Sequence, residues 1–389
     1  MAIADNMHGM SENRKENHML ELRKKLSNYQ EVFYLLFLLP MTGMSSMGIN
    51  SDDRIYLYVF AVAMLFLLLK MAVTDFTWRE ILVMAVLTLL FGVNFLRNGE
   101  KTLILTVMAI FGAKNVNLDK VMKYALWEKA VLTVGTLTLA ATGVIENEVL
   151  TLLKNDTYVN IPCYGYYHPN MAFANVFVVL LLSIIVYRDK MKWYVYVGET
   201  LIIMGAYKLF MCRTGVLVWG ALCMAVTFYR IIRHFHIERW MMKIFVAIPI
   251  ILAWLTLYIP HVIKKDPNFG KRIDVIMTGR MRLIGLVYDE IWTPEFVLGH
   301  SPSQSFDTMY FHLVYNYGWI LFVVSIVAYV MVLWYCSEHD EYYIIVALGI
   351  IAIYGYMEML PLSVLWNLPL LYMAKILFQG KKLRNEQLQ

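Results

Sequence analysis

The chain is poor in charged residues: Asp, Glu, Lys and Arg make up only 16% of its 389 residues, whereas 60% are hydrophobic. This balance, with a mean hydropathy of +0.57, excludes an ordinary soluble protein. Its repeated apolar runs of about 20 residues have the length of helices that cross a bilayer, so they indicate a protein with many membrane spans. The net charge of +5 is small and gives no sign of nucleic-acid binding.

Cysteine is also scarce, with four residues and no CxxC pair. Nothing in their spacing requires a disulfide, although one between Cys163 and Cys212 stays open because both are expected outside the cell. Residues 1–28 lack an apolar core and a cleavage site, which predicts a cytoplasmic tail and not a signal peptide. Internal repeats and low-complexity segments are absent. We therefore expect one membrane domain, residues 29–379, and a second cytoplasmic tail, residues 380–389.

The apolar runs predict an all-α fold, a polytopic transmembrane bundle of about twelve helices, with ten as the lower count. The expected spans begin near Glu31, Arg54, Thr77, Lys101, Val121, His168, Lys192, Arg213, Trp240, Met309, Tyr342 and Leu362.

Basic residues predict the orientation, because cytoplasmic loops of membrane proteins are rich in Lys and Arg. With both termini inside, the basic segments Arg188–Lys192 and Arg230–Lys243 fall inside, and Lys129 falls at a helix end. One extracytoplasmic loop, about residues 260–308, is the exception to the rule. It carries Lys264, Lys265, Lys271, Arg272, Arg280 and Arg282.

This loop is the only long connection between expected spans, at roughly 45–50 residues, and loops of that length are usually functional. Within it, "GRMRLIGLVYDEI" (279–291) has the pattern of a short amphipathic helix lying along the membrane interface.

External arginines have two explanations. The planar guanidinium suits anions such as lipid headgroups or lipid-linked phosphates, because it donates two parallel hydrogen bonds. Alternatively, Arg282 anchors the loop helix at the interface, and Arg213, at the start of a span, extends its head group to water. For Arg280 we favour ligand contact, because it follows Gly279 at an expected helix start.

Polar residues at other external span ends are further candidates. In "YGYYHPN" (164–170), His168-Pro-Asn170 is typical of a helix start, while the same polar groups beside Tyr164 suit a sugar. Two acids, Glu199 and Glu358, lie within or near apolar spans, where acids are costly and are candidates for function. Glu199 has the simpler alternative of pairing with a polar neighbour.

Four motifs recur in the order and spacing of a known family. They are "GYYHPN" (165–170), "CRTG" (212–215), "TGRMRLIGLVYDEIWTPEFVLGHS" (278–301) and "DTMYFHLVYNYGW" (307–319). Together they resemble the Wzy-type polysaccharide polymerases of the O-antigen polymerase and ligase superfamily. The resemblance covers roughly Cys163 to the C-terminus. The chain departs from the family pattern at two places. Many members carry His-Asn where this chain has Asp307-Thr308. Arginines often precede the His-Pro-Asn stretch in the family, whereas in this chain the nearest preceding basic residue is Lys154.

The resemblance implies a glycosyltransferase of the plasma or inner membrane, acting on the outer face. It would join oligosaccharide repeat units carried on undecaprenyl diphosphate into exopolysaccharide or capsule. Flippase and chain-length regulator proteins would be its partners, beside the lipid bilayer.

The implied site follows from the chemistry of the donor. Arg213 and Arg280 would stabilise the leaving diphosphate, with Arg282 as support. The hydroxyl of the acceptor sugar needs a group that accepts its hydrogen bond or its proton. Asp307 is the first choice for this role, ahead of His312 and Glu358. His168, Asn170 and Tyr164 would position sugar. No cluster of metal-ligand residue types is seen among the external residues, so we expect transfer without metal or cofactor.

Other functions remain as alternatives. A ligase that moves finished polymer to another acceptor would need the same groups. A flippase or transporter of lipid-linked sugars would be expected to place charges along a central path between repeated halves.

Overall fold

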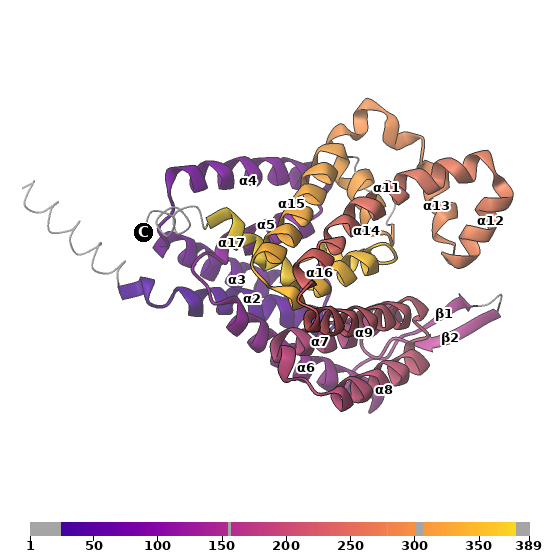
Figure 1. Ribbon diagram of the computed structural model, residues 1–389, viewed down its shortest axis with the longest axis horizontal. Helices are drawn as coiled ribbons and strands as arrows, with labels where there is room; N and C mark the ends of the chain where they lie inside the picture. Colours follow the sequence, from indigo (N-terminus) through magenta and orange to yellow (C-terminus); the bar gives the residue numbers. More distant parts are fainter. Residues whose placement is uncertain (1–24, 155–156, 278, 300–305, 379–389) are drawn as a thin grey trace, which may run out of the picture.

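The computed structural model describes residues 25–154, 157–277, 279–299 and 306–378, and the chain in these ranges is mostly helical (Figure 1). Residues 1–24 and 379–389, which hold most of the expected tails, lie outside the described residues. So does part of the long loop, residues 300–305.

A helix lies at each of the twelve predicted span positions. The first half of the chain contains α2 (Gln30–Ser46), α3 (Arg54–Val73), α4 (Trp78–Asn98), α5 (Thr102–Gly112) and α6 (Leu118–Ala141). The middle contains α7 (Pro169–Tyr187), α8 (Trp193–Phe210), α9 (Arg213–His234), α10 (Glu238–Met241) and α11 (Ile244–Lys265). The last part contains α14 (Met309–His312), the π-helical turn η4 (Leu313–Tyr317), α15 (Gly318–Glu338), α16 (Tyr342–Gly355) and α17 (Met373–Phe378).

Six helical segments in the described residues are long and apolar enough to cross a membrane. They are Arg54–Val73, Trp78–Asn98, Pro169–Lys190, Arg213–His234, Glu238–Lys265 and Met309–Glu338. The chain is therefore a multi-pass helical membrane protein, whereas the count of twelve spans is not established. Several other helices are short, since α5 has 11 residues and α16 has 14.

One element contradicts the all-α prediction. Strands β1 (Val149–Lys154) and β2 (Thr157–Pro162) form an antiparallel hairpin with Val149 opposite Pro162. Thr157, Tyr158 and Val159 are residue types that favour strands. The sequence alone predicts no element for this segment, which lies between the spans that begin near Val121 and His168. The hairpin projects at the same end of the molecule as α12 (Pro267–Ile276) and α13 (Arg280–Val287) (Figure 1).

Loops predicted to lie on one side of the membrane are found together. At one end, Lys114 after α5 contacts Glu80 at 2.6 Å and lies over the rings of Phe76 and Phe378. At the other end, the Asn98 amide of α4 donates to the Asn316 carbonyl at 2.7 Å. These contacts agree with the alternation of the chain between two ends, although which end faces the cytoplasm rests on the charge argument.

Cysteine labelling tests the orientation. Lys265 and His236 are both exposed, at the end of α11 and after α9. Three of the four native thiols, Cys163, Cys212 and Cys336, are buried, and Cys223 is partly buried within α9, so the native thiols interfere little. In intact cells we expect an impermeant maleimide to label Lys265→Cys, and to label His236→Cys only after permeabilisation. Labelling of both from the same side would show the predicted arrangement to be wrong.

Candidate functional site

The long loop folds into short helices. After α11 come α12 (Pro267–Ile276), α13 (Arg280–Val287), and the 3-10 turns η2 (Glu290–Trp292) and η3 (Pro294–Leu298). The amphipathic helix predicted for this loop is confirmed as α13, which buries Met281, Ile284 and Val287 on one face. Gly279 precedes it with φ +85°, a left-handed conformation that favours glycine. Arg280 is thus the first residue of the helix, as the sequence predicts.

Arg280 is the centre of a charged cluster. Its Nη2 lies 3.1 Å from Glu358 Oε1, and its Nε lies 3.2 Å from Asp307 Oδ2. The side chains of Arg280 and Glu358 are only 11% and 8% exposed, whereas Asp307 is 61% exposed. A buried pair is screened less by salt than an exposed one, and exposed pairs contribute little. The Glu358 contact is therefore the firm one, and Asp307 is held loosely.

The start of α7 joins the same cluster. The Asn170 amide donates to Glu358 Oε1 at 2.9 Å, so one carboxylate oxygen is shared by Arg280 and Asn170. His168 is the N-cap of α7, and its Nδ1 accepts from the Asn170 backbone N–H at 3.1 Å. In a neutral His168 the proton then sits on Nε2, which leaves that nitrogen as a donor. The helix-start interpretation of His-Pro-Asn is confirmed, while sugar binding there stays a prediction.

Two glycines of the recognised motifs shape the return of the loop. Gly299 and Gly318 lie against each other, both with positive φ, and a Cβ on either would clash with the backbone of the other's segment. The Asn94 amide of α4 caps this contact by donating to the carbonyls of Leu298 and Tyr317. The close approach anchors η3 against η4, at the base of the segment that begins with Asp307.

Other predicted residues have structural contacts of their own. Arg213 is the exposed first residue of α9, and the nearby Gly215 packs on the Phe173 ring of α7. That glycine is thus explained by helix packing. Arg282 is exposed, with its backbone N–H donating to Asp274 Oδ1 at 3.0 Å.

Tyr164 and His312 also have local roles. Tyr164 has φ +50° and its ring meets Phe210 edge-on at 5.6 Å. His312 is buried on α14 and its ring nitrogens lie 3.0 and 3.3 Å from the Asn316 amide. These contacts hold the turn before α7 and the start of the last long span. The roles predicted for both residues toward substrate stay untested.

Two charged residues, Lys129 and Glu199, are buried within the helices of the fold. Lys129 does not lie at a helix end: it is fully buried within α6, bonded to the hydroxyls of Ser45 and Ser46 at 3.1 and 3.2 Å. The adjacent charges Glu128 and Lys129 within a predicted span were the available signal, because charged residues inside a span are functional or internally paired. Glu199 accepts a hydrogen bond from Ser183, so the prediction of a polar neighbour is confirmed.

The chain matches no protein-family model, no curated protein and no solved structure. Its resemblance to the polysaccharide polymerases therefore stays a prediction from the motifs. The described residues contain no group of three His, Cys, Asp or Glu side chains that could hold a metal ion.

The residues of the charged cluster come from four different parts of the chain and form a candidate anion site. It joins α7, α13, the segment before α14 and the segment after α16, so residues 170, 280, 307 and 358 meet from distant parts of the chain. Two carboxylates share one guanidinium, and one of these carboxylates is exposed. An incoming anion can therefore replace Asp307 at the guanidinium while Glu358, held by Asn170, keeps its contact with Arg280.

Proposed function

We propose that this protein is a membrane glycosyltransferase that polymerises lipid-diphosphate-linked oligosaccharide repeat units on the outer face of the membrane. The observation that carries the proposal is the buried Arg280, which contacts the buried Glu358 and the exposed Asp307, while Asn170 donates a hydrogen bond to Glu358. The resemblance of the four motifs supports it, because the cluster draws its residues from three of them.

The cluster suits transfer from a diphosphate. The acceptor hydroxyl oxygen forms a bond to the anomeric carbon, and the bond from that carbon to the diphosphate oxygen breaks. Negative charge grows on the departing diphosphate, where a preorganised guanidinium stabilises it. The guanidinium has little to reorganise, because Glu358 already contacts its Nη2 and is itself held by a hydrogen bond from Asn170. Asp307, displaced from Arg280 by the diphosphate, is then available to accept the proton of the acceptor hydroxyl.

Reconstitution tests the proposal directly. Purified protein in vesicles receives purified lipid-linked repeat units, with and without EDTA, and the products are separated by size. We expect a ladder of polymer that forms equally with the chelator, and no ladder from Arg280→Ala protein. Transfer in a single step to another acceptor would instead identify a ligase. Unchanged substrate crossing the bilayer would identify a flippase, and either result would contradict the proposal.

A further inference from the structure

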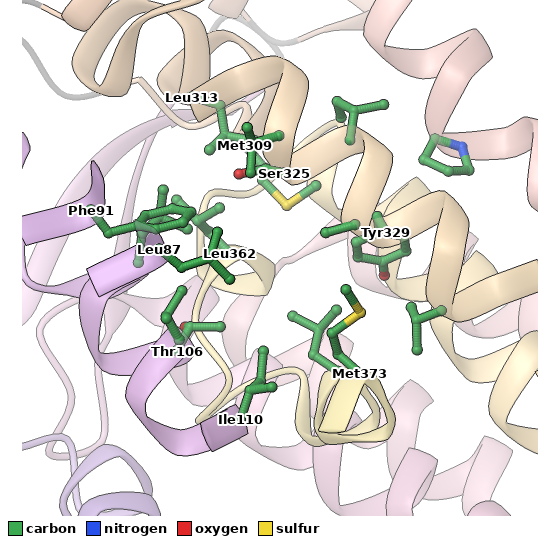
Figure 2. A pocket seen from close by; sticks show the side chains of 18 of the residues that line it. Leu87, Phe91, Thr106, Ile110, Met309, Leu313, Ser325, Tyr329, Leu362 and Met373 are labelled. Atoms are coloured by element: carbon green, nitrogen blue, oxygen red, sulfur yellow. The ribbon is translucent and has the colours of Figure 1, made fainter. Parts of the chain in front are cut away.

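An apolar pocket of about 120 Å³ lies between α4, α5, α15 and the segment that leads into α17 (Figure 2). Figure 2 shows Leu87 and Phe91 of α4 facing it, with Ile110 of α5, Tyr329 of α15 and Met373 on other sides. A cavity of roughly 150 Å³ with such a lining stays dry and binds small apolar molecules. Water is therefore a poor occupant of this pocket.

The pocket lies beside helices that can span the membrane. Both α4 and the segment that contains α15 are long and apolar enough to cross it, so hydrocarbon surrounds this part of the molecule. Of the residues of α4, only Phe91 and Asn94 are buried. A second apolar cleft of about 320 Å³ flanks α4, lined by Val86, Leu90 and Val93 on one wall and by residues of α15 on the other. Apolar surface therefore lines the space between α4 and α15 in both cavities.

The pocket and the charged cluster draw residues from the same two segments of the chain. Met309, which lines it, follows Asp307 by two residues, and Pro361, which also lines it, follows Glu358 by three. Met309 also packs against Gly355, where an added Cβ would come within 2.8 Å of its terminal methyl. The two segments that carry the carboxylates toward Arg280 thus form one rim of the apolar pocket. A lipid with a phosphate head group has the chemistry that suits these two environments.

We infer that this pocket holds part of the hydrocarbon chain of the lipid-linked donor while its diphosphate lies at Arg280. The inference rests on the proposed function, and it adds a place for the chain and an entrance between α4 and α15. Binding of the chain in a fixed pocket places the first phosphate at a constant distance from the guanidinium. An ordinary phospholipid chain is the competing occupant.

Two tryptophan variants on α15 separate the pocket from the outer surface of the helix. Ala328 lines the pocket, whereas the neighbouring Val327 is 50% exposed and is absent from its lining. Ala328→Trp should fill the pocket, and Val327→Trp should not. The probe is a polyprenyl phosphate with a diazirine in its chain, photolysed in phosphatidylcholine vesicles that contain the full-length protein. We expect adducts on peptides with Phe91 or Tyr329, lowered about tenfold by Ala328→Trp and unchanged by Val327→Trp.

Competition identifies the chain. Unlabelled polyprenyl phosphate should remove the adducts, and added phosphatidylglycerol should not. Adducts that survive Ala328→Trp, or that phosphatidylglycerol removes equally well, would overturn the inference. Ser325→Phe, on another wall position, replaces Ala328→Trp if that variant does not fold. Specific adducts without a polymer ladder would contradict the proposed function alone, and a ladder with unspecific adducts would contradict this inference alone.

Discussion

Arg280→Ala is expected to lower the rate of polymer formation by roughly 100-fold to 1,000-fold, the cost of losing one preorganised group that stabilises developing charge. Arg280→Lys should recover only part of this loss. The guanidinium reaches Glu358 with Nη2 and Asp307 with Nε, and a single ammonium cannot reproduce both directions. The measurement is the yield of polymer from lipid-linked repeats at equal protein level.

A matched control and a double variant show whether the effect is catalytic. Arg282→Lys changes an exposed arginine two residues along α13 and should be much milder. Removing Arg280 alone leaves Glu358 buried without its cation, which destabilises by about 3–5 kcal/mol for a buried pair. The double variant Arg280→Ala, Glu358→Gln removes that imbalance and keeps an acceptor for Asn170. Recovery of polymer in the double variant, or near-normal polymer from Arg280→Ala, would rule out a role for Arg280 in transfer.

Asp307→Asn is expected to reduce polymer formation by roughly 100-fold, as for the loss of a general base, with accumulation of lipid-linked single repeats. The substitution keeps the size of the side chain and removes its charge. Because Asp307 is 61% exposed and its pair with Arg280 is loose, stability should change by no more than about 0.5 kcal/mol. Product size and melting temperature are measured on the same preparations, so a folding defect is recognised.

Two further variants sharpen this test. Asp289→Asn removes another exposed loop carboxylate that also pairs with a cation, Lys264, and it should leave the ladder unchanged. Asp307→His should retain some activity, because members of the resembled family often carry histidine at that position. A normal ladder from Asp307→Asn would move the search to Glu358, since His312 is buried and contacts Asn316.

Local sequence was sufficient for features that depend on neighbours in the chain. Gly279 followed by the pattern of Arg280–Val287 predicts a helix start, because glycine takes positive φ and the apolar residues repeat at helical spacing. His168-Pro169-Asn170 predicts a cap for the same kind of reason. The hydropathy runs indicate a helical membrane protein, and a helix lies at each predicted span position.

Local sequence failed where several properties compete over a short stretch. The hairpin at residues 149–162 is short and precedes an apolar helix. Its strand-favouring residues are too few to predict a sheet from local sequence. Short helices such as α5 satisfy the hydropathy pattern without the length to cross a bilayer on their own, so helix length does not establish the count of twelve spans.

Composition and local pattern were enough to give the class of the protein, the helix that begins at Arg280 and the identity of the charged residues near the ends of helices. Tertiary structure decided which of these residues meet. Glu358 lies 78 residues from Arg280 and 188 from Asn170, and no local pattern records that their side chains share one oxygen. It also decided that Lys129 is buried and that Gly215 serves helix packing. The reason is physical: propensity and hydropathy act over a few residues, whereas a buried charge requires partners from other elements of the fold.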